Sequence, residues 1–180
     1  MNICVFCGSA TGENPLYAET AIELGSLFAK SSHSLVYGGG NIGLMGILAD
    51  AVLNNQGEVI GVIPDFLVQR EVGHRGVSRL EVVESMHGRK KRMADLSDAF
   101  IAMPGGWGTL DELAEILTWR QLGLIHQPIG LLNINNFFDP LLEQMRSMVK
   151  EGFLKADNLD FLQVEISGEK LLHRLVTRIV

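Results

Sequence analysis

The sequence predicts an α/β protein with a doubly wound, mainly parallel sheet of about seven strands and helices on both faces. Short apolar runs alternate along the chain with segments of helical periodicity, a pattern typical of parallel sheets. Most runs are nearly continuous, as expected for strands that are covered on both faces. Three glycine-containing turns directly follow predicted strands, which is where such sheets bind ligands.

The predicted strands occupy residues 3–7, 35–37, 59–63, 80–83, 100–103, 129–132 and 162–166. The predicted helices occupy residues 15–30, 43–54, 88–97, 109–122, 136–151 and 168–179. Pro15 suits a first helical turn, and Gly57 and Gly123 follow predicted helix ends. The sequence contains no repeat, linker or low-complexity tract, so residues 1–180 are expected to form a single domain.

Composition excludes several classes of protein. The chain of 180 residues is 47% hydrophobic and 20% charged, with a formal net charge of −6, so neither disorder nor nucleic-acid binding is expected. Two cysteines cannot form a disulfide scaffold, and no signal peptide is recognised, so a cytoplasmic location is expected. The longest uncharged stretches are interrupted by Gly, Asn, His or Pro, so no membrane span is predicted.

Neither a metal nor a cofactor is predicted. The five histidines and two cysteines lack the spacing of metal ligands. Cys4 and Cys7 have the spacing of a redox pair, but residues three apart on a strand point to opposite faces. The methionines at positions 45, 86, 93 and 103 are interpreted as core residues.

The first glycine turn, Gly8-Ser9-Ala10, comes directly after the predicted strand 3–7. A small turn with a hydroxyl group can present backbone N–H groups to an anion. An ordinary tight turn is the structural alternative.

The second turn runs from a predicted strand into a predicted helix at residues 37–46, YGGGNIGLMG. Gly38, Gly40 and Gly43 satisfy the pattern G-x-G-x-x-G in the context that the pattern requires. The Lys-Ser/Thr pair of a Walker loop is missing, and the turn does not follow the first strand. Phosphate binding is therefore favoured over dinucleotide binding, with close helix–sheet packing as the structural alternative.

The third turn, at residues 103–112, reads MPGGWGTLDE. Thr109 and Glu112 have the spacing of a capping box, which is a structural explanation for Glu112. Asp111, Glu112 and Glu115 fall on the side of the predicted helix away from its apolar residues. A carboxylate beside a bound phosphate is unfavourable unless it takes part in the chemistry.

Basic residues are concentrated in one window. Residues 70–92 hold seven of the fifteen Lys and Arg residues and three Glu residues, a charge of +4 that leaves −10 for the remainder. The window indicates either a solvated helix face or a local anion site. Within it, the guanidinium of Arg89 suits bidentate phosphate recognition.

The motifs YGGGNIGLMG, MHGRK and PGGWGTLDE together closely resemble the LOG family, the cytokinin riboside 5′-monophosphate phosphoribohydrolases. The likeness covers most of the chain, from CVFCGSA at residues 4–10 through GVIP at 61–64 and TWRQLG at 118–123 to GLLN at 130–133. The resemblance implies a Rossmann-like fold, a homodimer and hydrolysis of the N-glycosidic bond of a nucleoside 5′-monophosphate. Many relatives carry the label lysine decarboxylase, which these motifs do not support.

The resemblance implies that Arg89 and Glu112 form the catalytic pair. With the glycine turns included, the expected substrate-binding residues are Gly8, Ser9, Gly39, Gly40, Gly43, Glu71, Arg89, Lys90, Gly105, Gly106, Trp107, Gly108, Thr109, Leu110, Asp111, Glu112 and Thr118. Where the family often has Pro-Arg-Glu, this chain reads Gln69-Arg70-Glu71. The glutamate is kept, but the proline that would constrain the loop is absent. Trp119 and Leu122 are candidates for the dimer interface.

The expected function is hydrolysis of purine nucleoside 5′-monophosphates, with adenine or an N6-substituted adenine as the base, to free base and ribose 5-phosphate. Glu112 would stabilise the cationic sugar of the transition state and activate water, while Arg89 and the glycine turns hold the phosphate. The alternative is a non-catalytic nucleotide-binding or carrier module of the same fold, which has no need for the carboxylate.

A pyridoxal-dependent decarboxylase would need a Schiff-base lysine, whereas Lys90 and Lys91 adjoin arginines. The sequence leaves open whether AMP or an N6-prenylated nucleotide is the preferred substrate.

Overall fold

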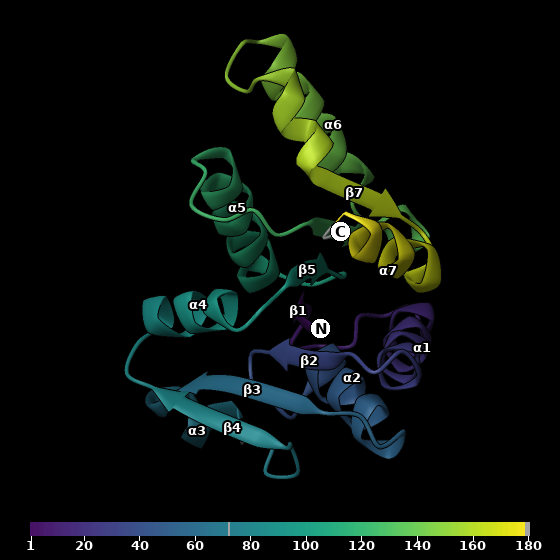
Figure 1. The fold of residues 1–180 in the computed structure, drawn as a ribbon, viewed down its shortest axis with the longest axis vertical. Helices are drawn as coiled ribbons and strands as arrows, with labels where there is room; N and C mark the ends of the chain where they lie inside the picture. The colour runs from purple at the N-terminus through teal and green to yellow at the C-terminus, as the bar shows by residue number, and fades with distance from the viewer. Residues whose placement is uncertain (72, 179–180) are drawn as a thin grey trace.

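The computed structural model describes residues 1–71 and 73–178, with the backbone alone for residues 69–71. In this part of the chain seven strands form one sheet in the order β4-β3-β2-β1-β5-β6-β7, and every neighbouring pair is parallel (Figure 1). The strands are β1 (Asn2–Phe6), β2 (Ser34–Tyr37), β3 (Val59–Pro64), β4 (Arg79–Val83), β5 (Ala99–Ala102), β6 (Ile129–Leu132) and β7 (Leu162–Glu165). The predicted doubly wound sheet is confirmed.

The helices are α1 (Leu16–Lys30), α2 (Gly43–Asn54), α3 (Asp65–Glu71), α4 (Met86–Asp95), α5 (Trp107–Gln121), α6 (Asp139–Lys150) and α7 (Gly168–Thr177), with short 3-10 helices η1 (Ile134–Asn136) and η2 (Ala156–Phe161). All six predicted helices are present, although residue 179 of the last lies outside the described residues. Helix α3 was not predicted, because seven residues are too few to show a helical period. Helices α4 and α5 each begin two residues earlier than predicted, which matters for the site.

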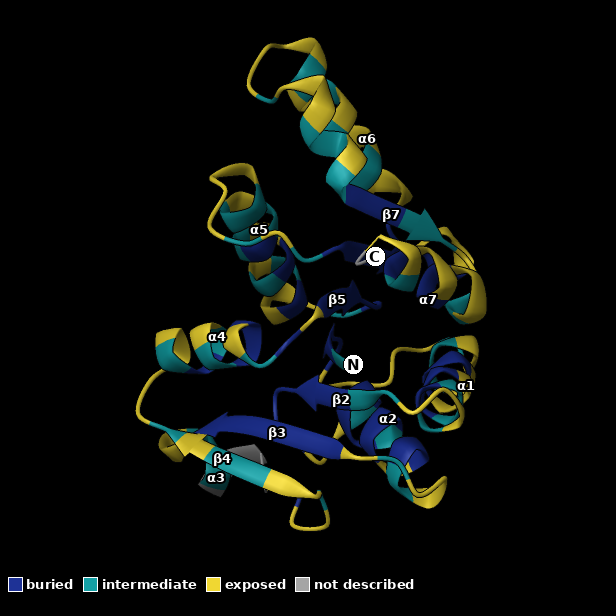
Figure 2. Ribbon diagram, viewed as in Figure 1, coloured by how far each residue is buried: buried dark blue, intermediate teal, exposed yellow. Residues whose placement is uncertain are grey.

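The helices cover both faces of the sheet. Figure 1 shows α1, α2 and α7 along one face and α4, α5 and α6 along the other. The strands feed two separate core clusters, because successive side chains point to opposite faces: Ile3 and Val5 belong to one, Cys4 and Phe6 to the other. The central strands are accordingly buried on both sides (Figure 2). Cys4 and Cys7 are free and lie in different clusters, as predicted.

The direction of winding reverses at β1. From β1 the chain moves outward through β2, β3 and β4, and then returns to place β5 on the other side of β1. Loops that leave two neighbouring strands in opposite directions open a crevice at their carboxyl ends. Here the loops after β1 and β5 remain joined by one bond, because the N–H of Gly8 donates to the carbonyl of Pro104 at 3.1 Å. No helix in the described ranges is both long and apolar enough to span a membrane.

Helices α1 and α2 pack most closely at Gly25. A Cβ on Gly25 would lie 2.7 Å from the Cβ of Ala51 and 2.9 Å from the carbonyl oxygen of Leu48. Gly25→Ala should therefore destabilise the protein by about 1–3 kcal/mol through overpacking, although the same change in an open helix stabilises by about 1 kcal/mol. Urea unfolding measures the difference, with Glu23→Ala on the exposed side of α1 as control. A Gly25→Ala protein at least as stable as the parent would contradict this packing.

Candidate active site

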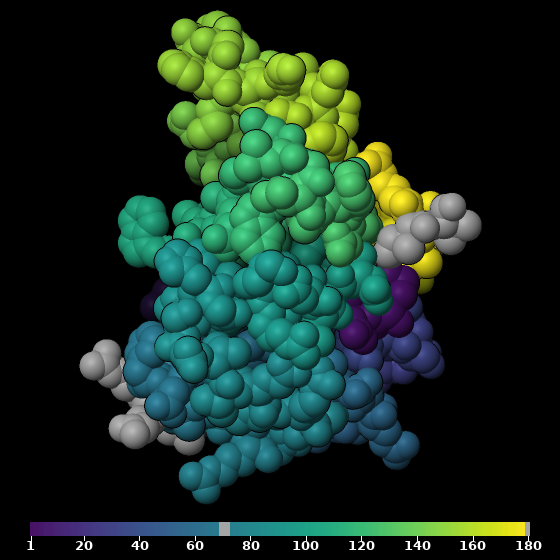
Figure 3. Space-filling view, turned by 60° about the vertical axis from the view of Figure 1, so that its left-hand side comes forward, coloured from purple at the N-terminus to yellow at the C-terminus, as the bar shows by residue number. Residues whose placement is uncertain are grey.

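A cavity of about 170 Å³ opens at the point where the winding reverses. It lies between the turn after β1 and the first turns of α4 and α5. Its walls are formed by Cys7, Gly8, Ser9, Met45, Met86, Arg89, Gly106, Trp107, Gly108, Thr109, Asp111 and Glu112. The structure thus brings together both members of the expected catalytic pair and much of the expected binding loop. On the outside, the teal and green atoms of α4 and α5 form one continuous surface (Figure 3).

Arg89 is a buried cation at this cavity, with only 6% of its surface exposed. Its Nη2 donates to the carbonyl oxygen of Gly38 at 3.0 Å, and its Nη1 lies 3.9 Å from the sulfur of Met86. The Nε atom is buried and has no hydrogen-bond partner among the described residues. A buried charge with unsatisfied donors is costly, so this guanidinium fits an anionic ligand that enters the cavity.

The start of α4 fixes where Arg89 lies. Ser85 is extended and caps the helix, because its hydroxyl accepts a hydrogen bond from the N–H of Gly88 at 3.0 Å. The helix consequently begins at Met86, and Arg89 lies in its first turns. The sequence offered this cap, a serine before MHGRK, but the prediction began the helix at residue 88 and missed it.

The absence of a side chain at Gly38 leaves the space that the guanidinium of Arg89 occupies. A Cβ at position 38 would lie 1.8 Å from Nη2 of Arg89, so any side chain there would displace the guanidinium. Gly39 and Gly40 are buried, and Gly43 packs so tightly on the β1 turn that a Cβ would lie 2.2 Å from the carbonyl carbon of Ser9. None of these three glycines lines the cavity, although Met45 in the same segment does. The tight contact at Gly43 fits the packing alternative, and phosphate binding by this turn stays a prediction.

Glu112 lies opposite Arg89 on α5. Burial raises the pKa of its carboxyl group from 4.5 to about 7, although the positive charge of Arg89 opposes the shift. Asp111 and Glu115 raise the pKa further, whereas Lys90 lowers it. A carboxyl group with a pKa near neutrality can exchange a proton with water or substrate at physiological pH.

The start of α5 excludes the capping-box explanation for Glu112. The helix begins at Trp107 with Gly106 as its N-cap, so Thr109 is the third helical residue rather than the cap. The N-cap glycine has no side chain that could accept a hydrogen bond from the first N–H groups, and a Cβ at Gly106 or Gly108 would meet no described atom within 4 Å. The first N–H groups of α5 are therefore open to a ligand, and the helix dipole favours an anion there.

Lys90 does not line the cavity. Its Nζ lies 3.0 Å from Asp111 and 3.2 Å from Glu115, and its side chain is only 11% exposed. The ammonium group thereby ties α4 to α5, and it holds the helices that carry Arg89 and Glu112. The structure thus pairs Lys90 with two carboxylates, and the expected contact with substrate stays a prediction.

The remaining basic window is mostly neutralised on the surface. Arg79 and Arg92 both pair with Glu81, and Lys91 pairs with Asp95. The solvated-face interpretation therefore describes these residues, and the anion-site interpretation describes Arg89.

Several expected contacts lie elsewhere. Thr118 is exposed and donates its hydroxyl to the carbonyl of Ala114, and Leu110 packs on the core beneath α5. Gly105 faces Thr109, whose Oγ1 would lie 2.2 Å from an added Cβ. The side chain of Glu71 lies outside the described residues.

Three cavity residues were missed by sequence reasoning. Cys7, Met45 and Met86 line the cavity, but their apolar character gave no signal that separates them from core residues. Met86 is 37% exposed, so its interpretation as a core residue is wrong. Among the residues that the structure describes, no group of three or more His, Cys, Asp or Glu side chains could hold a metal ion.

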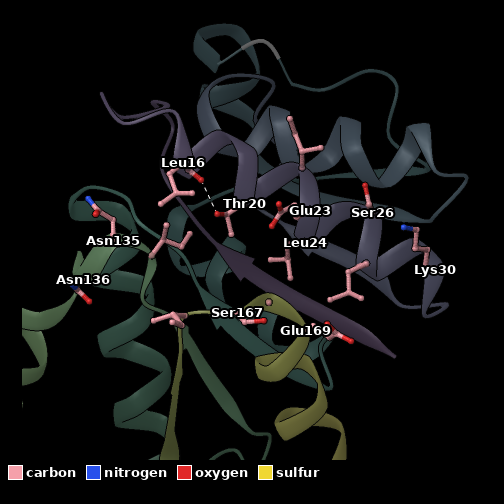
Figure 4. A pocket seen from close by; sticks show the side chains of 15 residues that line it. Leu16, Thr20, Glu23, Leu24, Ser26, Lys30, Asn135, Asn136, Ser167 and Glu169 are labelled. Carbon is pink, nitrogen blue, oxygen red and sulfur yellow. Dashed lines mark hydrogen bonds between the residues drawn. The ribbon is translucent and has the colours of Figure 1, made fainter.

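A larger hollow, about 830 Å³, lies elsewhere, between α1 and the start of α7 (Figure 4). Leu16, Thr20 and Glu23 line one wall, and Ser167 and Glu169 line the other. Two carboxylates and no buried cation make it unsuited to an anion. The smaller cavity is the candidate active site, because it contains the buried Arg89 and the Glu112 carboxyl group of raised pKa.

The fold and the site together define a doubly wound α/β protein with a buried guanidinium and a carboxyl group of raised pKa in one cavity. A family model described as "Possible lysine decarboxylase" matches residues 45–175. A cytokinin riboside 5′-monophosphate phosphoribohydrolase of Arabidopsis thaliana is 46% identical over 173 residues, which are 96% of this chain and 81% of the relative. The LOG enzyme of Oryza sativa subsp. japonica, which bears the same name, is 50% identical over 155 residues, 86% of this chain and 64% of the relative. The chain belongs to the LOG family.

Solved structures share the fold at lower identity. A molybdenum cofactor binding protein from Rippkaea orientalis is 23% identical, with a TM-score of 0.74 over 99% of this chain and 97% of that one. The molybdenum cofactor carrier protein of Chlamydomonas reinhardtii is 21% identical, with a TM-score of 0.70 over 99% and 97% of the two chains. These similarities establish the architecture alone.

Displacing Arg89 without removing it tests the anion site. Gly38→Ala should weaken binding of ribose 5-phosphate at least about tenfold, because the new methyl group overlaps the guanidinium and breaks a charged hydrogen bond. Isothermal titration calorimetry measures the dissociation constant. Gly88→Ala is the matched control, since its Cβ would meet no atom closer than 3.3 Å. Equal affinities in both variants would show that Arg89 does not contact the anion.

Proposed function

We propose that this chain hydrolyses the N-glycosidic bond of adenine or N6-substituted adenine nucleoside 5′-monophosphates and releases free base and ribose 5-phosphate. The observation that carries the proposal is the pairing of a buried, incompletely bonded Arg89 with a Glu112 carboxyl group of pKa about 7 in one cavity. The names and high identities of the curated relatives support the same reaction. A single domain of residues 1–180 would contain the whole site.

The phosphate would bind where α5 begins. The N–H groups after Gly106 are uncapped, and Gly106 and Gly108 leave open space in front of them. Arg89 supplies a positive charge from the neighbouring helix. Two converging sources of positive potential would anchor the phosphate and so position C1′ of the ribose near Glu112.

The reaction needs a group that activates water. As the bond between C1′ and the base nitrogen breaks, positive charge develops on the ribose ring. The ionised Glu112 carboxylate would stabilise that charge and accept a proton from the attacking water, whose oxygen bonds to C1′. The leaving base takes up a proton and departs with the bonding electron pair.

A nucleotide carrier is the alternative function. Known carriers share the fold, but a protein that only stores an anion gains nothing from a partly buried carboxylate in the binding cavity. Glu112 opposes anion binding electrostatically and costs stability when it ionises. Its position in the cavity therefore favours catalysis.

A homodimer remains part of the proposal. Of the two residues that suggested it, Trp119 is half-buried and packs on the core, whereas Leu122 is 64% exposed at the end of α5. Leu122 and the neighbouring Leu124, which is 67% exposed, would supply apolar surface to such an interface.

The proposal is tested by incubation with AMP, isopentenyl-AMP, GMP and UMP, followed by chromatography of the released base. We expect release of adenine or its N6-substituted form, and turnover reduced by about 10²–10⁴-fold in Glu112→Gln, because an amide cannot accept a proton. Glu84→Gln, an exposed carboxylate at the same edge of the sheet, is the control. Affinity for ribose 5-phosphate should persist in Glu112→Gln. Binding without base release from any nucleotide would instead support the carrier.

The pH profile identifies the base. The kcat/KM for AMP should rise with pH about a midpoint near 7, because the Glu112 base is active when ionised. Lys90→Met removes a charge that lowers the Glu112 pKa, so its midpoint should move to higher pH. Lys91→Met is the matched control, since Lys91 pairs with Asp95 on the surface. The phosphate of AMP titrates identically in all three proteins. An unmoved midpoint in Lys90→Met would exclude Glu112 as the titrating group.

A further inference from the structure

The segment between α3 and β4 contains a buried histidine that hydrogen-bonds the glycine turn, helix α2 and its own segment. The backbone N–H of His74 donates to the carbonyl of Gly39 at 3.0 Å. Its ring Nε2 lies 2.9 Å from Oδ1 of Asp50 on α2, and its Nδ1 accepts a hydrogen bond from the N–H of Gly76 at 3.2 Å. His74 is only 7% exposed. Both ring nitrogens and the backbone N–H form hydrogen bonds within the protein.

These contacts fix the state of the ring. Because Nδ1 accepts a hydrogen bond from a backbone N–H, it carries no proton in this arrangement. The proton of the neutral ring is then on Nε2, which donates to the Asp50 carboxylate. A carboxylate that orients a histidine through the opposite ring nitrogen is a familiar way of holding an imidazole in one tautomer.

The turn that His74 contacts cannot fix its own geometry. Residues 38–40 are three consecutive glycines, and Gly39 has a positive φ of 76°. Glycine has wide conformational freedom and no side chain with which to restrict it. The orientation of the Gly38 and Gly39 carbonyls therefore depends in part on the groups that bond them. Those groups are Nη2 of Arg89 at Gly38 and the N–H of His74 at Gly39.

We propose that His74 and Asp50 are positioning residues that hold the glycine turn, and through the Gly38 carbonyl the guanidinium of Arg89, in the geometry that binds the phosphoribosyl group. The proposal rests on the proposed function. Asp50 anchors the ring to α2, the ring and Gly76 hold the His74 backbone, and that backbone holds Gly39. Neither side chain lines the cavity, so both act through the turn rather than on the substrate.

A general contribution to stability does not explain the pair as well. The Asp50 side chain is 59% exposed, and a contact to such an exposed carboxylate stabilises a fold little. Its geometric effect is larger, because it selects one ring orientation next to a turn of three glycines that have no side chains of their own. Small displacements of a positioning group are costly in a site that depends on alignment.

The first experiment compares three side chains at position 74 by calorimetry with ribose 5-phosphate. His74→Ala removes both ring bonds and should weaken binding about tenfold. His74→Gln should recover most of the affinity, because its amide N–H can reach the position of Nε2 and donate to Asp50. A Gln variant that binds as weakly as the Ala variant would overturn the proposal, as would an Ala variant that binds like the parent.

Position 50 provides a second, independent pair. Asp50→Asn keeps an acceptor oxygen and should bind ribose 5-phosphate within about threefold of the parent, whereas Asp50→Ala should resemble His74→Ala. Because Asp50 is largely exposed, both variants should fold even if His74→Ala does not. Indistinguishable affinities of Asp50→Asn and Asp50→Ala would overturn the proposal.

A stability control separates positioning from loss of structure. Ser97→Ala removes a buried hydrogen bond of 2.6 Å to the carbonyl of Met93, just before the amino end of β5. It should lower the melting temperature without changing the affinity for ribose 5-phosphate. An equal loss of affinity in Ser97→Ala would show that the His74 effect is only structural.

AMP kinetics distinguish the two proposals. If the positioning proposal holds, His74→Ala should raise KM for AMP more than it lowers kcat, because water activation by Glu112 does not depend on the turn. A loss confined to kcat would overturn it. If the parent binds ribose 5-phosphate but releases no base, the hydrolase proposal fails, and the calorimetric comparison still decides the role of His74 and Asp50.

Discussion

The hydrogen bond from Arg89 to the carbonyl of Gly38 is the interaction on which the site depends. A guanidinium remains charged in any protein environment, so placing one in the interior demands either a partner or a ligand. Among the described residues, Arg89 has one carbonyl partner at 3.0 Å, and its buried Nε has no hydrogen-bond partner. This incomplete hydrogen bonding of the guanidinium fits a site in which a bound anion accepts the remaining hydrogen bonds.

Burial in the same cavity also changes the pKa of Glu112. Arg89 and Lys90 lower its pKa, but burial is the larger effect and raises the pKa to about 7. Since the ordinary value is 4.5, this group lowers the stability of the folded state as the pH rises from about 4.5 to about 7, a loss that a glutamine would not cause. The fold therefore tolerates a group that destabilises it at the pH where the group acts as a base. Lys90 limits that cost while it joins α4 to α5.

The architecture was accessible from the sequence, but part of the site was not. Apolar runs and helical periods identified seven strands and six helices because each pattern is local. The role of Glu112 depended on the start of α5: a shift of two residues turned Thr109 from a cap into a third helical residue. The contacts of Lys90 with Asp111 and of His74 with Asp50 join residues 21 and 24 positions apart. No periodicity relates such pairs, so only the fold could reveal them.

The glycines of the site illustrate why motif matching alone could not assign them. Gly38 and Gly105 are required because atoms of the protein itself, the Arg89 guanidinium and the Thr109 hydroxyl, already occupy the space of a side chain. Gly106 and Gly108 face empty space instead, so they keep the first N–H groups of α5 accessible. The same residue type thus fixes protein groups on one side of the cavity and leaves room on the other. A substitution in the first pair acts through Arg89 and Thr109, whereas one in the second pair acts directly on whatever binds at the helix terminus.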